Sequence, residues 1–196
     1  SAPYPYPEWT RWRFVRGIRI LLFYTIILPI TYLMSRMCVE GRAHLDSLSG
    51  PVLFVANHVT LADSALVIAG LPVRLRHRLA IAMEGELLRD WLHPPAGTNL
   101  PTRLRWLAQY VLVNLFFHVF PLPKQSGFRQ SFAYAGDCVD RGESVLVFPE
   151  GTRAPRGQMR MSSFKAGIGV LAQELSIPVV PVAFDGLYEL KRRKQY

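Results

Sequence analysis

A histidine and a carboxylate stand five residues apart in the segment Asn57-His58-Val-Thr-Leu-Ala-Asp63. The segment follows a short apolar run typical of a buried strand and precedes an apolar run typical of a helix. Because ligands of open α/β sheets bind at the carboxyl ends of strands, a histidine here can face a cleft. Its imidazole suits general-base catalysis near neutral pH, and Asp63 could orient it and stabilise the imidazolium.

The same residues have a second interpretation that involves no chemistry. Thr60 and Asp63 are spaced like the N-cap and the third helical residue of a capping box, and His58 would then be an ordinary loop histidine. The spacing alone favours the cap for Asp63. The two roles do not exclude each other.

The sequence holds no Gly-x-Ser-x-Gly nucleophile elbow. If His58 is a base, the nucleophile is therefore expected to belong to the substrate. This favours direct group transfer over a covalent enzyme intermediate.

A second polar segment, Phe148-Pro-Glu-Gly-Thr-Arg153, also follows a strand-like run. Pro149 and Gly151 favour a turn, and the glycine lets a ligand approach the backbone closely. Arg153 carries a planar fork suited to phosphate. Further cations follow at Arg156, Arg160 and Lys165. The segment predicts a phosphate site, although the pattern alone slightly favours a solvated basic loop.

The elements that must position these segments alternate between two patterns. Strand-like runs occupy residues 51–56, 79–83, 144–148 and 177–184. Helix-like runs occupy residues 62–70, 104–120, 127–141 and 163–175. This alternation predicts an α/β fold, with a mostly parallel central sheet flanked by helices on both faces.

Two of these runs carry a further expectation. The segment Ile177-Pro-Val-Val-Pro181-Val predicts an edge strand or a bulge because of its prolines, with a plain core strand equally compatible with its composition. Residues 104–120 are too apolar for a solvent-facing helix, so we expect them to be buried or to dip into lipid. Asn114 and His118 within this run are expected to be hydrogen-bonded polar groups of the core or an interface.

The first 40 residues predict a membrane-interacting segment. Trp and Arg alternate over residues 9–17, before an apolar run at 18–34, as is typical of a membrane–water interface. The run is shorter than the about 20 residues of a straight spanning helix, and Pro29 is expected to kink or break it. We therefore expect a shallow or re-entrant helical anchor over residues 1–40, with an ordinary buried helix as the alternative, and a catalytic domain over residues 41–196.

Composition narrows the class of protein. The chain has 196 residues, a net charge of +9 and a pI of about 10.0, which suits one domain that binds nucleic acid, anionic lipid or phosphorylated small molecules. Cys38 and Cys138 are expected to be free thiols, and their spacing predicts no metal site. The abrupt end after the run 191–194 (Lys-Arg-Arg-Lys) predicts C-terminal truncation.

Together the motifs resemble those of the glycerolipid acyltransferase family, whose best-known members are the lysophosphatidate (1-acylglycerol-3-phosphate) acyltransferases. The family's Asn-His-x4-Asp block is matched by Asn57, His58 and Asp63. Its Phe-Pro-Glu-Gly-Thr-Arg block is matched by residues 148–153, and its Ile-Pro-Val-Val-Pro block by residues 177–181. A lone His-x4-Asp is a weak signal, but the intact later block makes the resemblance, over about residues 50–185, a strong one.

The family's second block, Gly-x-x-Phe-x-x-Arg, is where this sequence departs. The corresponding stretch reads Phe120-Pro-Leu-Pro-Lys-Gln-Ser-Gly-Phe-Arg129. Lys124 or Arg129 would replace the phosphate-binding arginine. The departure bears on the head group of the acceptor more than on the reaction.

The resemblance implies transfer of a fatty acyl group from acyl-CoA or acyl carrier protein to the free hydroxyl of a lysophospholipid such as lysophosphatidate, without a cofactor or metal. It implies that His58 is the base and that Asp63 orients it. The residues implied to bind substrate are Asn57, Lys124, Arg129, Glu150, Gly151, Thr152, Arg153 and Lys165. The enzyme would act in phospholipid synthesis or remodelling, associated with the cytoplasmic face of a membrane.

Other functions remain alternatives. The altered second block leaves glycerol 3-phosphate and lysophosphatidylethanolamine open as acceptors, and a non-catalytic lipid-binding domain would lack a reason for His58 and Asp63. A nucleic-acid module is disfavoured because the cations are not interleaved with aromatic side chains. The expected partners are membrane lipids, the lysophospholipid acceptor and the acyl thioester donor, with no nucleic acid; a truncated chain would also be compatible with a fused or associated acyl-activating domain.

Overall fold

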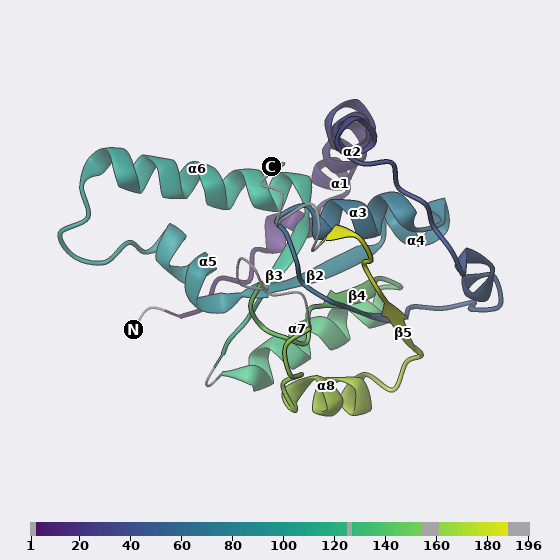
Figure 1. Ribbon diagram of the computed structural model, residues 1–196. Coiled ribbons are helices and arrows are strands. Elements are labelled where there is room, and N and C mark those ends of the chain that lie inside the picture. The colour runs from purple at the N-terminus through teal and green to yellow at the C-terminus, as the bar shows by residue number, and fades with distance from the viewer. Residues whose placement is uncertain (1–2, 125–126, 154–160, 188–196) are drawn as a thin grey trace.

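A five-stranded parallel sheet forms the centre of the computed structural model, which describes residues 3–124, 127–153 and 161–187 (Figure 1). The strand order is β3-β2-β4-β1-β5. All neighbouring strands pair in parallel. The strands are β1 (Leu53–Ala56), β2 (Leu79–Glu84), β3 (His118–Leu122), β4 (Ser144–Val147) and β5 (Val179–Val182). The α/β fold with a parallel sheet is therefore confirmed.

Helices connect the strands and cover both faces of the sheet (Figure 1). Between strands lie α3 (Asp63–Gly70), α4 (Val73–Arg76), α5 (Gly85–Leu92), α6 (Leu100–Phe116), α7 (Phe128–Asp140) and α8 (Gly167–Leu175). Ahead of β1 lie the short η1 (Glu8–Arg11), α1 (Arg13–Leu22), η2 (Phe23–Ile27), α2 (Leu28–Met34) and η3 (Arg42–Leu45).

Strand residues divide strictly between two cores, because successive side chains of a strand point to opposite faces. One core packs under α3, α5, α6 and the N-terminal helix, and it takes Phe54, Ala56, Leu79, Ile81, Val119 and Leu146 from the strands. The other packs under α7 and α8, and it takes Leu53, Ala80, Ala82, Phe120, Val145 and Val147. Both faces are apolar, which is why the strands read as continuous apolar runs rather than as alternating ones.

The two strands that contain proline lie at the two edges of the sheet. Pro181 sits in β5, opposite Val55 of β1, and Pro121 sits in β3, opposite Met83 of β2. An edge strand tolerates a residue without an N–H donor because one of its sides has no partner strand. The edge position expected for residues 177–182 is confirmed.

The prediction of a helix over residues 104–120 is wrong for the carboxyl end of this run. Helix α6 ends at Phe116, Phe117 adopts an extended conformation, and the remainder of the run is β3. An apolar run does not specify a helix or a strand by itself, and here the chain must return to the sheet to pair with β2.

Burial of α6 inside the domain, one of the two expectations for this run, is also wrong. Only Tyr110 and Asn114 of α6 are buried. Its exposed apolar side chains are Leu100, Leu104, Leu107, Val111 and Leu112. This surface has no covering element among the residues that the structure describes.

The N-terminal helix does not break at Pro29. Helical structure is continuous over residues 13–34, with the wider π-helical turn of η2 directly before α2. The wider turn accommodates the missing N–H and the bulk of the proline ring. By length and composition this helix could cross a membrane, although core helices and signal sequences also have such properties.

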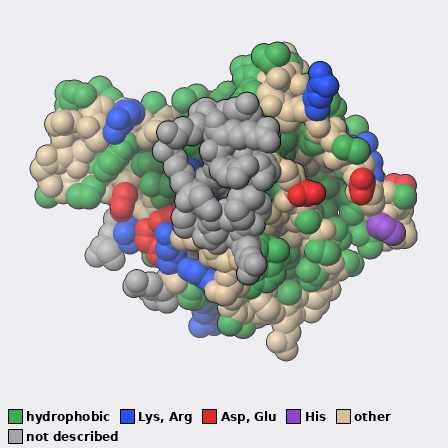
Figure 2. All heavy atoms as spheres, in the orientation of Figure 1, with side chains coloured by type: hydrophobic (Ala, Val, Ile, Leu, Met, Phe, Trp, Pro, Cys, Tyr) green, Lys and Arg blue, Asp and Glu red, His purple; other side chains and the backbone are tan. Residues whose placement is uncertain are grey.

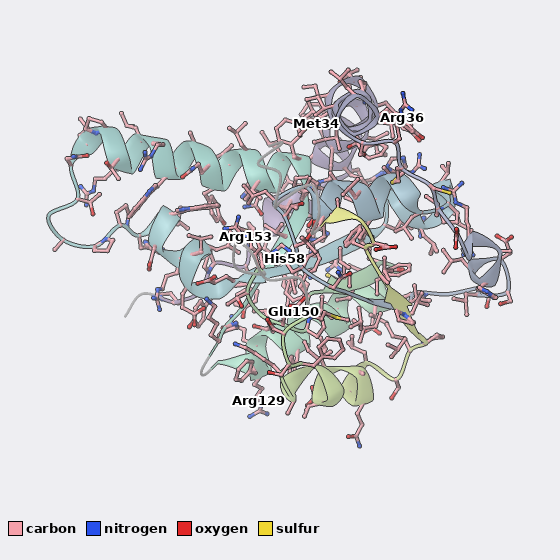
Figure 3. All side chains as sticks on the ribbon, viewed as in Figure 1. Met34, Arg36, His58, Arg129, Glu150 and Arg153 are labelled. Carbon is pink, nitrogen blue, oxygen red and sulfur yellow. The ribbon has the colours of Figure 1, made fainter. Side chains whose placement is uncertain are left out.

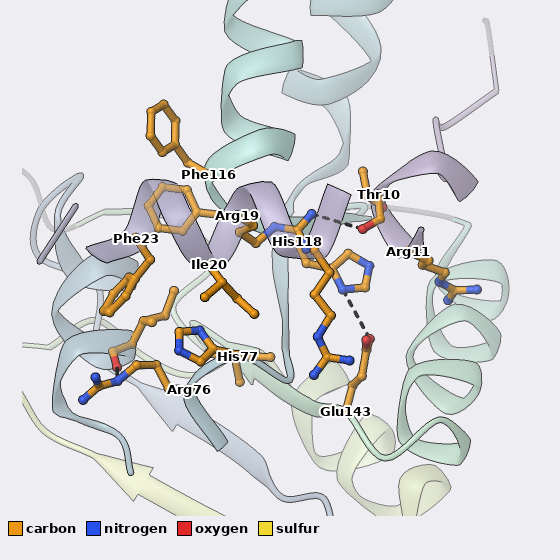
Figure 4. Close-up of a pocket in the computed structure, with 14 residues that line it drawn as sticks. Thr10, Arg11, Arg19, Ile20, Phe23, Arg76, His77, Phe116, His118 and Glu143 are labelled. Carbon is orange, nitrogen blue, oxygen red and sulfur yellow. Dashed lines mark hydrogen bonds and ion pairs between the residues drawn. The ribbon is translucent and has the colours of Figure 1, made fainter. Parts of the chain in front are cut away.

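Arg19 attaches the N-terminal helix to the domain. Its Nη2 donates to the carbonyls of Thr10 (3.1 Å) and Asn114 (3.0 Å). Beneath the helix lies a small cavity of about 30 Å³, and Thr10, Arg19, His118 and Glu143 are among the residues that line it (Figure 4). The attachment is polar at Arg19 and apolar at Phe23, which belongs to the core under the helix, and the outer face of the helix stays exposed.

His118 and Asn114 are both buried and hydrogen-bonded, as expected, but Asn114 Oδ1 has no hydrogen-bond partner among the described residues. His118 Nε2 lies 3.1 Å from the Tyr134 hydroxyl, and His118 Nδ1 lies 3.3 Å from Glu143 Oε2. Asn114 Nδ2 donates to the Tyr110 carbonyl at 2.8 Å.

We predict that the protein loses stability as the pH falls from 7.5 to 5.5. Burial, opposed in part by Glu143, lowers the pKa of His118 below its ordinary value. The unfolded chain therefore binds more protons than the folded one as the pH falls below about 6.5, and each proton bound favours unfolding. Denaturant titrations at both pH values would measure this, and His118→Gln should show a smaller loss than the wild type. An equal loss in both would assign the pH dependence to other groups.

Candidate active site

The polar segments converge at the end of the sheet where the carboxyl ends of all five parallel strands lie. The His58 segment follows β1, the Glu150 segment follows the adjacent β4, and Lys124 follows β3. Figure 3 shows His58, Glu150 and Arg153 close together at these carboxyl ends, whereas Arg129 lies apart on α7.

Asp63 is completely buried and binds His58 directly. One carboxylate oxygen, Oδ2, lies 2.8 Å from His58 Nδ1. The carboxylate also accepts hydrogen bonds from the N–H of Val59 (2.6 Å), the N–H of Thr60 (2.9 Å) and the Thr60 hydroxyl (2.6 Å). These donors compensate for burial of the charge, and the carboxylate favours the tautomer of His58 that carries its proton on Nδ1.

The capping interaction differs from the capping box expected from the spacing. Helix α3 begins at Asp63 itself, with Ala62 as its N-cap. Thr60 Oγ1 accepts from the N–H of Ala62 at 3.1 Å while donating to Asp63. Asp63 therefore holds the turn before α3 and binds the imidazole with the same carboxylate.

Further contacts hold both the ring and the backbone of His58. It stacks on the ring of Phe148, with ring centroids 4.3 Å apart and an angle of 24° between the planes. The backbone N–H of His58, not its ring, donates to Glu150 Oε1 at 2.8 Å, and Glu150 Oε2 accepts from the backbone N–H of Ser162 at 2.8 Å. Glu150 is buried, and its two hydrogen bonds connect the loop after β1 to the loop after β4.

Asn57 has a similar bracing position. Its side chain donates to the carbonyl of Phe184 at 3.3 Å and accepts from the N–H of Phe184 at 2.7 Å. It thereby ties the loop after β1 to the chain after β5. The structure places Asn57 and Glu150, both expected to bind substrate, as buried supports behind His58.

His58 faces a cavity of about 480 Å³. Its polar wall contains Lys124, Gly151, Thr152, Arg153 and Lys165, together with Glu84. Its apolar wall includes Ile81, Met83, Leu87, Val113, Phe117, Val119, Leu122, Phe128, Phe132 and Ile168. Arg129 is exposed and does not line the cavity, while Arg156 and Arg160 fall outside the described residues.

The family model described as Acyltransferase matches residues 36–185, which is more than half of the chain. The chain belongs to the acyltransferase family. The matched region begins two residues after α2 ends and includes every strand of the sheet. It also contains His58, Asp63 and the polar wall of the cavity.

Two curated relatives are similar over short stretches. A 1-acyl-sn-glycerol-3-phosphate acyltransferase of Pseudomonas aeruginosa is 46% identical over 57 residues, which are 29% of this chain and 21% of the relative. A chloroplastic 1-acyl-sn-glycerol-3-phosphate acyltransferase of Brassica napus is 42% identical over 50 residues, 26% of this chain and 14% of the relative. The aligned stretches thus span a minor part of each relative. No solved structure matches significantly.

The structure places the two candidates for the cation of the acyltransferase second block differently. Lys124 lines the cavity and Arg129 does not. Lys124 also follows His118 by six residues, as the family's arginine follows its glycine. In this register His118 and Pro121 stand where the family has Gly and Phe.

Sequence reasoning missed three residues of this acyltransferase site. The motifs give Phe148 no role of its own, they give Thr60 only the role of a cap, and they do not contain Glu84. Glu84 ends β2, so its position at the carboxyl end of a parallel strand was the signal that could have found it.

One cluster of possible metal ligands lies elsewhere among the described residues. Ligand atoms of His118, Cys138 and Glu143 lie within 4.8 Å of one another, near the amino ends of β3 and β4. Arg11 Nη2 is 3.4 Å from Cys138 Sγ, and burial raises the pKa of this thiol to about 12. A protonated thiol beside a guanidinium is a poor cation ligand. The expectation that the reaction needs no metal or cofactor stays a prediction.

Gly151 is required by its backbone and by its neighbour. Its φ is +67°, and a Cβ there would lie 2.7 Å from Lys165 Cε. We predict that Gly151→Ala lowers the free energy of unfolding by about 1–3 kcal/mol and displaces Lys165, which weakens substrate binding. Denaturant titration and the KM for the acceptor would measure both effects.

Gly169→Ala is the matched control, because a Cβ at this position on α8 meets nothing within 4 Å. It should be neutral or slightly stabilising. Equal effects of the two substitutions would show that the turn at Gly151 has no special requirement.

Proposed function

We propose that this acyltransferase moves a fatty acyl group from a thioester donor, acyl-CoA or acyl carrier protein, to the free hydroxyl of a lysophospholipid such as lysophosphatidate. The observation that carries the proposal is the pair formed by His58 and Asp63 at the wall of a cavity that is cationic on one side and apolar on the other.

His58 acts as the general base. Asp63 occupies Nδ1, so Nε2 is the nitrogen that accepts the proton of the acceptor hydroxyl. As the proton leaves, the hydroxyl oxygen attacks the thioester carbonyl and forms a tetrahedral intermediate. The carbon–sulfur bond then breaks, and the thiolate takes the proton from the imidazolium. A positioned base of this kind contributes about 10²–10⁴ in rate.

The cations of the cavity suit the phosphate of the acceptor. Lys124, Arg153 and Lys165 line the same space as His58. The guanidinium of Arg153 matches two phosphate oxygens, and the lysines act as point charges. Gly151 leaves room for Lys165 to cross the turn.

The apolar wall suits an acyl chain. It is formed mainly by side chains of β2, β3, α5, α6, α7 and α8, and burial of a chain there would provide about 0.8 kcal/mol per methylene. The two relatives, both named 1-acyl-sn-glycerol-3-phosphate acyltransferases, support an acceptor of this class.

We predict that His58→Ala lowers kcat by about 10²–10⁴ while the KM for the acceptor changes little. Asp63→Asn should also lower kcat, and it should destabilise the fold because its amide would place N–H groups against the donors of Val59 and Thr60. The measurement is release of free CoA from acyl-CoA with and without a lysophospholipid, together with product detection.

His44→Ala is a control for removal of a histidine outside the cavity. Equal CoA release by the wild type and His58→Ala would contradict the base assignment. Release that does not depend on an acceptor would identify a thioesterase instead. A panel containing lysophosphatidate, glycerol 3-phosphate and lysophosphatidylethanolamine would separate the acceptors.

The exposed apolar surface supports association with a membrane. The N-terminal helix exposes Phe14, Leu21, Tyr24, Ile26, Ile30, Tyr32, Leu33 and Met34, and Trp12 directly before it is also exposed. The helix contacts α6, whose outer face is also apolar. In Figure 2 hydrophobic side chains gather over α2 and over the far end of α6. We place this surface in the cytoplasmic leaflet, since free thiols such as Cys38 and Cys138 suit a reducing compartment.

We predict that the double variant Leu21→Glu/Leu33→Glu releases the protein from vesicles of mixed zwitterionic and anionic lipid in a flotation assay. Two charges in the apolar layer oppose insertion. Val170→Glu, on the exposed face of α8, is the matched control and should still float. Flotation of the double variant at the wild-type level would contradict a membrane role for this helix.

A further inference from the structure

Lys124 is held at both of its ends by carboxylates. Its Nζ lies 2.8 Å from Glu84 Oε1, and its backbone N–H donates to Glu86 Oε1 at 3.0 Å. Glu84 and Glu86 flank Gly85 at the junction of β2 and α5. One short segment therefore binds the backbone N–H of this lysine and pairs with its ammonium group. In the register described above, this lysine replaces the second-block arginine.

The backbone end of this arrangement is braced by the N-terminal segment. The Tyr4 hydroxyl donates to Glu86 Oε1 at 3.2 Å. The Tyr4 ring lies between two glycines, because a Cβ at Gly85 or Gly127 would come within 3.1 or 3.2 Å of it. Burial would raise the pKa of Glu86, but the N–H groups of Lys124 and Glu86 and the Tyr4 hydroxyl lower it, so this carboxylate stays ionised at neutral pH.

The ion pair between the Lys124 ammonium and Glu84 is more exposed than the hydrogen bonds to Glu86. The side chains of Lys124 and Glu84 are 33% and 38% exposed, and both line the cavity. An ion pair with this exposure is weak enough to be exchanged for another anion. The ammonium is therefore fixed within reach of the acceptor, but in the free enzyme its charge is matched by Glu84.

We propose that Glu84 is a specificity-determining residue that competes with the acceptor phosphate for Lys124. This inference rests on the proposed function. The acceptor phosphate displaces Glu84 from Lys124 when it binds, and Glu84 returns when the acylated product leaves. Since the product carries the same phosphate as the acceptor, a cavity without this counter-charge would retain the product.

The competition depends on the charge of the head group. A dianionic phosphomonoester gains more from Lys124 than a monoanionic phosphodiester does, and it is also repelled more strongly by Glu84. A neutral acceptor has no reason to displace Glu84. Removing the carboxylate charge should therefore lower the KM most for a phosphomonoester, less for a phosphodiester and not at all for a neutral acceptor.

The experiment measures KM, kcat and product inhibition for Glu84→Gln with lysophosphatidate, lysophosphatidylglycerol and monoacylglycerol. We expect the KM for lysophosphatidate and the inhibition constant of its product to fall by about two- to fivefold. The shift should be smaller for lysophosphatidylglycerol and absent for monoacylglycerol. Asp90→Asn, which removes an α5 carboxylate outside the cavity, is the matched control and should change none of these values.

Lys124→Met tests whether Glu84 acts through the lysine. In the Lys124→Met background, Glu84→Gln should lower the KM for lysophosphatidate by a clearly smaller factor, because only the direct repulsion between Glu84 and the phosphate remains to be relieved. An undiminished shift in that background, or no shift in the single variant, would overturn the competition. If Glu84→Gln does not fold, Glu84→Asp shortens the side chain and should shift the KM in the same direction by a smaller factor.

Direct binding separates this inference from the proposed function. Calorimetric titration with short-chain hexanoyl lysophosphatidate needs no turnover, and Glu84→Gln should bind it more tightly than the wild type. Acyl transfer with unchanged binding would overturn the role of Glu84 and leave the function standing. Tighter binding without transfer to any acceptor would overturn the function and support the competition for Lys124.

Discussion

The buried carboxylate of Asp63 is the interaction on which the rest of the site depends. It has no exposed surface, and it is neutralised by donors from a single short turn, the N–H groups of Val59 and Thr60 and the Thr60 hydroxyl. A charge buried in this way is tolerated only if its partners are all in place. The turn, the start of α3 and the orientation of His58 are therefore formed together.

Parallel pairing extends this local constraint to the whole cavity. Because β1 and β4 are adjacent, Glu150 reaches the backbone of His58 while its other oxygen binds Ser162. Because β2 and β3 are adjacent, Glu84 reaches Lys124. The sheet thus brings His58, cations and an apolar wall together at the carboxyl ends of its strands, although they are far apart in the chain.

The molecule separates two kinds of polar interaction. Buried groups such as Asp63, Asn57 and Glu150 bind the backbone and keep the loops in place. Partly exposed groups such as Lys124 and Arg153 face the cavity and are available to a ligand. Burial makes a hydrogen bond costly to leave unsatisfied, whereas partial exposure makes an ion pair exchangeable.

The sequence by itself determined the α/β class, because the alternation of strand and helix patterns is a local property. It offered the edge position of β5 and the pairing of His58 with Asp63 only as alternatives to a core strand and a helix cap. It did not determine that residues 118–122 form β3, since an apolar run suits either a helix or a strand. Only the tertiary structure placed Arg129 outside the cavity, turned Asn57 and Glu150 into supports and set Glu84 beside Lys124. Those outcomes depend on which strands are neighbours, and strand order is a long-range property that no local pattern contains.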